Sequence, residues 1–358
     1  MGILMLGAAI LLLLSKEICF KENTEESNKK FLIFAGIVLA VIFSCRNAVS
    51  NYGNDLNNYY RLFERAIKSD SLKRFLNNEA MEEGYVFLNW LIARVIKWPQ
   101  FILVFHAVFC IGVTLRFIYS FSDDVLISVL GFMAFGVMQF YLTGFRQSFA
   151  IAICLIALEL ALKKKFIPFV ITVFIASTVH QTAIIFIPIY WLVKLKLSKL
   201  YVFLDLAAIA VLYKFVPRLI AIGNEVFERE YQGKFGGNRL GGLINLLIGA
   251  AVLAFILYYS NAQGEKVLKA EDSKTGAYIN AFFHMTLIGL GVYALRYQAL
   301  VLERISLYFT SPLFILAPYA INTAFDKQSR RMLEPVFCAI LLFLIWWRFG
   351  NISYEVFW

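Results

Sequence analysis

The chain of 358 residues is 60% hydrophobic and 16% charged, and its formal net charge is +10. This composition is too apolar for a water-soluble fold, so it predicts an all-α polytopic membrane protein. Apolar stretches of nearly membrane-spanning length recur over residues 1–358 without a polar segment of domain size, which indicates one integral-membrane domain. The five cysteines are scattered, without CxxC or metal-ligand spacing. We therefore expect them to pack in the interior, and we expect no metal site and no cofactor.

The first apolar run lacks a basic flank before it and a small-residue cleavage site after it, which favours a retained span over a signal peptide. The whole pattern predicts about 12 crossings of about 20 residues each. They fall at 3–20, 31–45, 100–119, 125–142, 146–163, 166–179, 181–194, 199–217, 241–260, 276–296, 303–324 and 331–349. The short pair 166–179 and 181–194 is expected to form a hairpin with its tip at "STVHQT".

Residues 46–98 form a predicted external loop with interfacial helices. An amphipathic helix is expected at 56–68, with Asp55 at its N-cap, because a set of apolar residues recurs on one helical face. These residues are Leu56, Tyr59, Tyr60, Phe63 and Ile67. The apolar stretch after Gly84 is too short to cross a membrane and carries Arg94 and Lys97, so it is expected to re-enter or to lie in the interface.

Basic residues in short loops favour the cytoplasmic side of a membrane. This rule places the lysine-rich loops inside and both termini outside, together with 46–98, "TGFRQ", His180, 218–240 and "RYQALVLER". Arginines then gather outside and lysines inside, a separation that the rule alone does not explain. The planar arginine fork binds phosphate and carboxylate groups in a bidentate way, so this face is expected to meet such a ligand. Snorkelling of arginine to any interface is the alternative.

Several polar residues on the predicted outer face are candidates for function. Arg146 and Gln147 begin a span, where an ionisable residue usually faces the bundle interior or a wet cavity. His180 and Gln181 lie at the hairpin tip, and the histidine has either a structural or a catalytic role. Helix capping and interfacial anchoring are the structural alternatives for Asp55 and Arg46.

The loop 218–240 combines glycines with charged and aromatic side chains, among them Arg229, Tyr231 and Arg239. This composition is typical of a mobile lid or of an ordinary solvated loop. The sequence contains no Walker A loop, HExxH, GxSxG or dinucleotide fingerprint, which argues against a soluble nucleotide as the energy source. The adjacent Asp123 and Asp124 fall in a predicted inner turn, so they do not support an external metal site.

Four motifs in order resemble the EpsG-like branch of the Wzy polysaccharide polymerases, which join lipid-linked repeat units of bacterial capsule, exopolysaccharide or O-antigen. The motifs are Arg46 with "GND" and Tyr59, "EEGYVFLNWL" from Glu82, "FRQSFAIAI", and "STVHQTAIIFIPIYW". A weaker fifth motif is "ERISLYF", with Arg304 and Tyr308. Each motif alone is unspecific, but together they cover about two thirds of the chain.

The resemblance implies a GT-C-like glycosyltransferase of the bacterial cytoplasmic membrane, with its active site facing outside. Its substrates would be undecaprenyl-pyrophosphate-linked glycans, and membrane lipids, a flippase and chain-length regulators are candidate partners; nucleic acid is not expected. The chemistry needs a base for the attacking hydroxyl and cations for the departing pyrophosphate. Candidates for the base and its orienting group are Asp55 and His180, ahead of Glu83. Candidates for substrate contacts are Arg46, Tyr59, Arg146, Gln147, Gln181, Arg229, Tyr231, Arg239, Arg304 and Tyr308.

Two other classes of function remain open. A flippase or transporter for lipid-linked oligosaccharides would also bind lipid pyrophosphate, but should show related halves with broken helices. A glycan ligase or a membrane acyltransferase would share an external arginine and histidine. The product separates them, because loss of a polymerase leaves single repeat units on lipid, whereas loss of a ligase leaves long unattached chains.

Overall fold

The computed structural model describes residues 1–48, 54–227, 239–262, 274–299 and 301–357. These residues are helical apart from turns, loops and one isolated antiparallel bridge between Arg46 and Val356. Seven of the described helices are long and apolar enough to cross a membrane, or eight if the bent pair α16 and α17 forms one span. The prediction of a multi-pass helical membrane protein is confirmed. The prediction of about 12 crossings is not.

The chain forms two compact units: residues 1–187 with 332–358 are unit 1, and residues 188–331 are unit 2. The first ten helices of unit 1 follow in chain order. They are α1 (Gly2–Ile18), α2 (Glu25–Ser44), α3 (Asn54–Lys68), α4 (Leu72–Asn78), α5 (Glu83–Val95), α6 (Phe101–Phe121), α7 (Val125–Ala134), α8 (Val137–Tyr141), α9 (Phe145–Leu162) and α10 (Phe166–Val179). The 3-10 helix η1 (Gln181–Phe186) and most of α18 (Lys327–Phe349) complete the unit.

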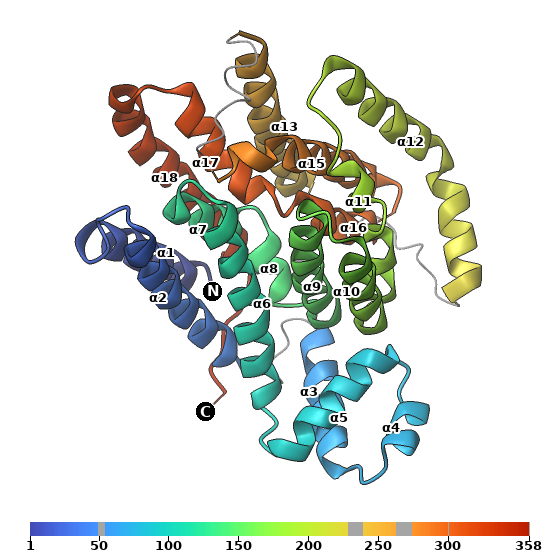
Figure 1. The fold of residues 1–358 in the computed structure, drawn as a ribbon. Helices are drawn as coiled ribbons and strands as arrows, with labels where there is room; N and C mark the ends of the chain where they lie inside the picture. The colour runs from blue at the N-terminus through green and yellow to red at the C-terminus, as the bar shows by residue number, and fades with distance from the viewer. Residues whose placement is uncertain (49–53, 228–238, 263–273, 300, 358) are drawn as a thin grey trace. The chain divides into compact units, whose positions relative to one another are not determined.

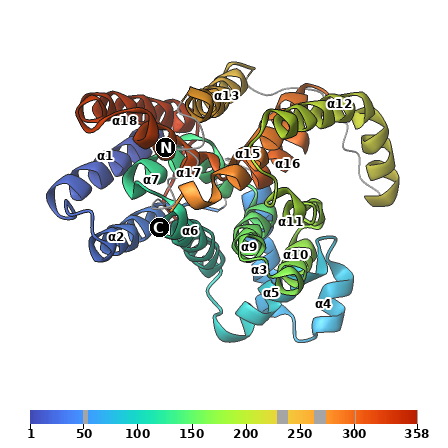
Figure 2. The same ribbon diagram turned by 45° about the horizontal axis from the view of Figure 1, so that its top comes forward.

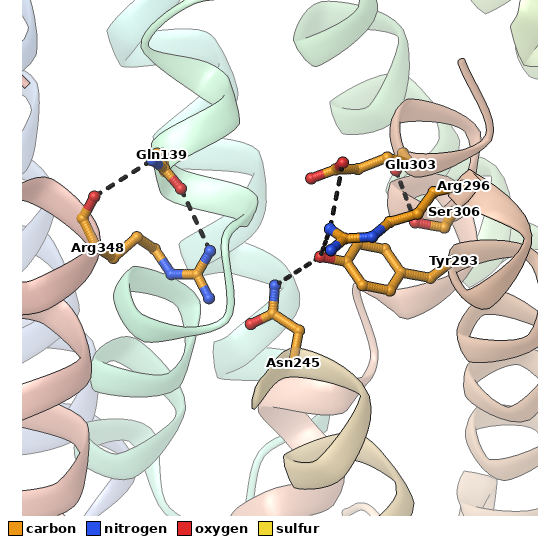
Figure 3. A network of polar contacts seen from close by, with 7 residues as sticks. All are labelled: Gln139, Asn245, Tyr293, Arg296, Glu303, Ser306 and Arg348. Carbon is orange, nitrogen blue, oxygen red and sulfur yellow. Dashed lines mark hydrogen bonds and ion pairs between the residues drawn. The ribbon is translucent and has the colours of Figure 1, made fainter. Parts of the chain in front are cut away.

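The predicted span at 125–142 is broken, which is one reason for the smaller count. Gly136 adopts a left-handed φ of 98° between α7 and α8. The Arg348 side chain from α18 donates from Nε to the carbonyl oxygen of Ala134 at 2.6 Å. Its Nη1 donates to Oε1 of Gln139 at 3.2 Å (Figure 3). An arginine therefore satisfies a carbonyl at the end of α7 that the helix itself leaves open.

Helices α3, α4 and α5 lie together at one end of unit 1, and α5 packs on α10 (Figures 1 and 2). The predicted amphipathic helix is present as α3, whose buried side chains include Leu56, Tyr59 and Phe63. Asp55 lies in its first turn rather than at its N-cap, because α3 already begins at Asn54. The 13-residue helix α5 is too short to span a bilayer, as expected.

Unit 2 contains α11 (Ile189–Leu192), α12 (Lys199–Phe227), α13 (Arg239–Ala262), η2 (Gly276–Tyr278), α15 (Ile279–Ala294), η3 (Leu295–Tyr297), α16 (Val301–Thr310) and α17 (Leu313–Ala324). The axes of α16 and α17 differ by 49°. The predicted lid at 218–240 begins as a continuation of α12, since that helix runs to Phe227. Residues 228–238, with Arg229 and Tyr231, lie outside the described residues, and Arg239 is the first residue of α13.

Unit 2 buries two polar groupings within its helices. Nδ1 of His284 lies 2.5 Å from Oδ2 of Asp205, and its Nε2 lies 3.1 Å from the Lys196 carbonyl oxygen. The Arg296 side chain donates to the hydroxyl of Tyr293 at 2.7 Å, and Asn245 donates to the same hydroxyl at 3.2 Å (Figure 3). Both groupings tie separate helices of the unit together through hydrogen bonds made in an apolar surrounding.

Candidate functional site

The central feature of unit 1 is a buried carboxylate, Glu82, held between a histidine and an arginine. Its Oε1 lies 3.1 Å from Nδ1 of His180, and its Oε2 forms an ion pair with Nη1 of Arg146. An ionised carboxylate only accepts hydrogen bonds, so Nδ1 of His180 is the donor. The Glu82 side chain is 3% exposed, whereas those of His180 and Arg146 are 16% and 19% exposed. The carboxylate is thus the covered member, and the two groups beside it are accessible.

Three helices bring these side chains together. Arg146 is in the first turn of α9, His180 directly follows α10, and Glu82 directly precedes α5. A Cβ on Gly84 would overlap the side chain and the carbonyl oxygen of Thr178. The glycine therefore permits the close approach of α5 to α10 that places Glu82 beside His180.

The local charges keep Glu82 ionised. Burial alone would raise its pKa, but the hydrogen bond from His180 and the positive charge of Arg146 outweigh burial and lower the pKa from 4.5 to about 2. A carboxylate with this pKa is a poor general base. It instead orients the imidazole and stabilises positive charge on it, which leaves Nε2 of His180 as the basic nitrogen.

Tyr59 of α3 closes one side of this cluster. Its ring stacks on that of Phe145 with centroids 5.2 Å apart, and the Arg146 guanidinium carbon lies 5.9 Å from its centroid. The ring of Tyr85 on α5 meets the Tyr59 ring edge-on, with the two centroids 5.7 Å apart. Burial raises the pKa of Tyr59 despite the nearby arginine, so its hydroxyl remains protonated near neutral pH. The ring lies against the arginine, and the hydroxyl accepts a hydrogen bond from the Arg146 guanidinium.

The arginine has capacity beyond its ion pair. Glu82 occupies Nη1 of Arg146, and the guanidinium also donates to the Tyr59 hydroxyl, while the Nε of Arg146 is buried without a hydrogen-bond partner among the described residues. A guanidinium carries five N–H donors, and the partly exposed Arg146 side chain keeps donors beyond its bond to Glu82 for phosphate oxygens. The predicted role of Arg146 in binding phosphate is compatible with this geometry.

Arg46 is buried and bonded to backbone carbonyl oxygens. It is 4% exposed, and it donates from Nη1 to the carbonyl oxygen of Leu142 at 2.8 Å and from Nε to that of Phe43 at 3.2 Å. The guanidinium carbon lies 4.5 Å from the Phe43 ring centroid. These contacts show that Arg46 joins the end of α2 to the turn before α9. Its contact with pyrophosphate stays a prediction.

The remaining candidates of unit 1 are divided by burial. Gln147 is 5% exposed beside Arg146, Asp55 is half-buried, and Gln181 is exposed at the start of η1. Glu83 is exposed, whereas its neighbour Glu82 is enclosed. Glu83, and not Glu82, was among the predicted candidates for the base, and a catalytic role for Glu83 stays a prediction.

A signal for Glu82 was present in the sequence. Within α5 the buried positions are Tyr85, Val86, Asn89 and Ala93, while Phe87 and Leu91 are exposed. Glu82 continues the buried set one turn earlier, and Glu83 continues the exposed set.

Two candidates, Arg304 and Tyr308, are on α16 of unit 2, where Arg304 is exposed and Tyr308 is 1% exposed. Their part in substrate binding stays a prediction. Within the ranges that the structure describes, no group of three or more histidine, cysteine, aspartate or glutamate side chains is arranged to hold a metal ion.

Comparison with known proteins matches residues 7–356 to the model of the EpsG family. Neither the curated proteins nor the solved structures give a match to this chain. The family match spans almost the whole sequence, including Glu82, Arg146, His180 and Tyr59, which we call the Glu82 cluster. The chain belongs to the EpsG family.

Proposed function

We propose that this protein polymerises lipid-linked oligosaccharide repeat units into a bacterial surface polysaccharide. Membership of the EpsG family indicates a polysaccharide polymerase in general, and the apolar helices make it a multi-pass membrane protein. The undecaprenyl pyrophosphate carrier, the outer leaflet of the cytoplasmic membrane and the GT-C-like fold are the more specific parts of the proposal. Lipid pyrophosphate is the leaving group.

The observation that supports this function best is the pairing of His180 with Glu82 beside Arg146. Glycosyl transfer from a pyrophosphate requires a base for the attacking hydroxyl and positive charge for the leaving group. Glu82 holds Nδ1 of His180 at 3.1 Å, which directs the basic Nε2 away from the carboxylate. Arg146 adds a cation on the other oxygen of the same carboxylate.

In the proposed reaction, a hydroxyl at the non-reducing end of one lipid-linked unit attacks the anomeric carbon of the growing glycan. The new glycosidic C–O bond forms as the bond from that carbon to the pyrophosphate oxygen breaks. The hydroxyl proton passes to Nε2 of His180, and Glu82 stabilises the imidazolium that results. The pyrophosphate leaves on its lipid, with its charge stabilised by the Arg146 guanidinium.

This assignment changes the predicted partner of the histidine. Asp55 and His180 were expected to act together as base and orienting group, whereas the proposal gives the orienting role to Glu82. Asp55 stays a candidate for contact with the glycan, since it lies one helical turn before Tyr59 on α3. Glu83 has no role in the proposed reaction, and its exposed side chain supplies a neighbouring control.

The test is reconstitution of the purified protein in vesicles with defined undecaprenyl-pyrophosphate repeat units. A polymerase converts single units into a ladder of longer lipid-linked chains without any nucleotide or second protein. Movement of intact single units across the vesicle membrane without a ladder would identify a flippase. Transfer of a chain to a separate acceptor without elongation would identify a ligase. Either result would overturn the proposal.

A further inference from the structure

The segment after α18 turns back and contacts the end of α2. Within unit 1, the N–H of Asn47 donates to the carbonyl oxygen of Glu355 at 2.7 Å, and the N–H of Phe357 donates to that of Cys45 at 3.1 Å. These two bonds enclose the antiparallel bridge between Arg46 and Val356. The hydroxyl of Tyr354 also donates to the carbonyl oxygen of Ile42 at 2.9 Å. We call residues 354–357 the C-terminal strap.

The opposite edge of the same short stretch is held as well. Gln100 is 3% exposed, and its Nε2 donates to the carbonyl oxygens of Ser44 and Arg46 at 2.6 and 2.8 Å. The strap adds a ring contact, because the ring centroids of Phe357 and Trp98 lie 6.0 Å apart. Residues 44–47 are therefore fixed from two sides by groups distant in the sequence.

This stretch carries the Arg46 side chain, which reaches the turn before α9. Its Nη1 bonds to the Leu142 carbonyl oxygen at 2.8 Å, in the turn from which α9 begins three residues later. Arg146 is in the first turn of that helix. A second contact joins the same parts, since the Phe43 ring lies 5.6 Å from that of Phe145. Arg46 and Phe43 thus contact the turn and the first residue of the helix that carries Arg146.

We propose that the C-terminal strap is a positioning element for the Glu82 cluster, acting through Arg46 and the turn at 142–144. The strap holds the backbone of Arg46 through two main-chain bonds, and the guanidinium transmits that position to the start of α9. The inference rests on the proposed polymerase function for its effect on activity. Its structural part, the coupling of the strap to α9, is independent of that function.

A matched pair of substitutions tests the main-chain bond. Phe357→Pro removes both the N–H donor and the ring, whereas Phe357→Ala removes the ring and keeps the donor. Displacing a positioning contact by about 1 Å lowers catalysis by up to about 100-fold. We therefore expect Phe357→Pro to lower kcat about 10- to 100-fold with a much smaller change in KM, and Phe357→Ala to stay near wild type. Removal of residues 354–358 should reproduce the proline variant.

A readout independent of activity is hydrogen exchange of the backbone amides at 146–149. It should be faster in Phe357→Pro than in Phe357→Ala, without substrates present. If the proline variant matches wild type in both kcat and exchange, the inference is wrong. If exchange accelerates as expected but the wild-type protein forms no polymer, the polymerase proposal fails and the coupling stands.

The last experiment asks whether the strap stays closed during turnover. Cys45 and Phe357 flank the bridge and are joined by the bond from the Phe357 N–H to the Cys45 carbonyl oxygen, and antiparallel residues bonded in this way have Cα atoms about 5.5 Å apart, within the range of a disulfide. Phe357→Cys should therefore form a disulfide with Cys45 on mild oxidation, and not in the double variant that also carries Cys45→Ala. The oxidised protein should keep the kcat of its reduced form. Loss of activity on oxidation that returns on reduction would show that the strap must open, which would overturn a fixed positioning role.

Discussion

Comparing Glu82→Gln with Glu83→Gln distinguishes the functions of the two adjacent glutamates in "EEGYVFLNWL". Glutamine keeps the shape of the side chain and an acceptor oxygen for His180, but it removes the negative charge between the histidine and Arg146. Glu83→Gln makes the same chemical change one position later on an exposed side chain. The two variants therefore form a matched pair that differs in burial.

The expected loss of stability follows from the charge environment. The fall in the pKa of Glu82 from 4.5 to about 2 corresponds to about 3 kcal/mol, at about 1.4 kcal/mol for each tenfold change in affinity for the proton. Removal of one partner of a buried ion pair costs about 3–5 kcal/mol, which is the same order. We expect Glu82→Gln to lower the free energy of unfolding by about 3 kcal/mol. Glu83→Gln should change it by less than about 0.5 kcal/mol.

Activity should fall further than stability explains. Without the carboxylate, the imidazole loses its fixed tautomer and the charge that stabilises its protonated form, and loss of such support to a general base costs about 10²- to 10⁴-fold. The assay is elongation of labelled lipid-linked repeat units by equal amounts of folded protein, with chain length read on a gel. Elongation by Glu82→Gln within about threefold of wild type, or a larger defect in Glu83→Gln, would refute the assigned role of Glu82.

Three other outcomes follow from the same cluster. Gly84→Ala should separate α5 from α10 at Thr178 and lower elongation at least as much as it lowers thermal stability, while Gly112→Ala, whose Cβ would enter open space, should change neither. Arg146→Lys keeps the charge but loses the planar fork, so its elongation rate should be nearly as low as that of Arg146→Ala at equal protein level. Because the pKa of Glu82 is lowered on folding, its contribution to stability is complete above about pH 4.5 and is lost as the pH falls towards 2. The difference in melting temperature between wild type and Glu82→Gln should therefore be largest near neutral pH and shrink below about pH 4.5.

The helical class and most apolar segments were predictable from the sequence, because burial in lipid imposes long runs of apolar residues. The number of crossings was not predictable by the same means. The segment 125–142 has the length and composition of one span, yet it breaks at Gly136, where Arg348 donates to the carbonyl oxygen of Ala134. That contact joins residues more than two hundred positions apart. A hydropathy pattern contains no information about such a partner.

The site was predictable in part for a related reason. Arg146 and His180 stand out because a charged residue and a histidine interrupt apolar runs. Glu82 does not stand out in that way, since it lies among polar residues beside a second glutamate. Only the periodicity of α5, with Tyr85 and Asn89 on the buried face, separates the two.

The cluster also explains how a buried glutamate stays charged beside a histidine. A lone buried carboxylate would become protonated, and a lone histidine would have no fixed tautomer. Arg146 keeps Glu82 charged, and the charged Glu82 holds the proton of His180 on Nδ1. The charge of Glu82 and the tautomer of His180 therefore both depend on their neighbours in the cluster. For this reason replacement of Arg146 should alter the base as well as phosphate binding, so the kcat of Arg146→Ala should fall even at saturating lipid-linked substrate.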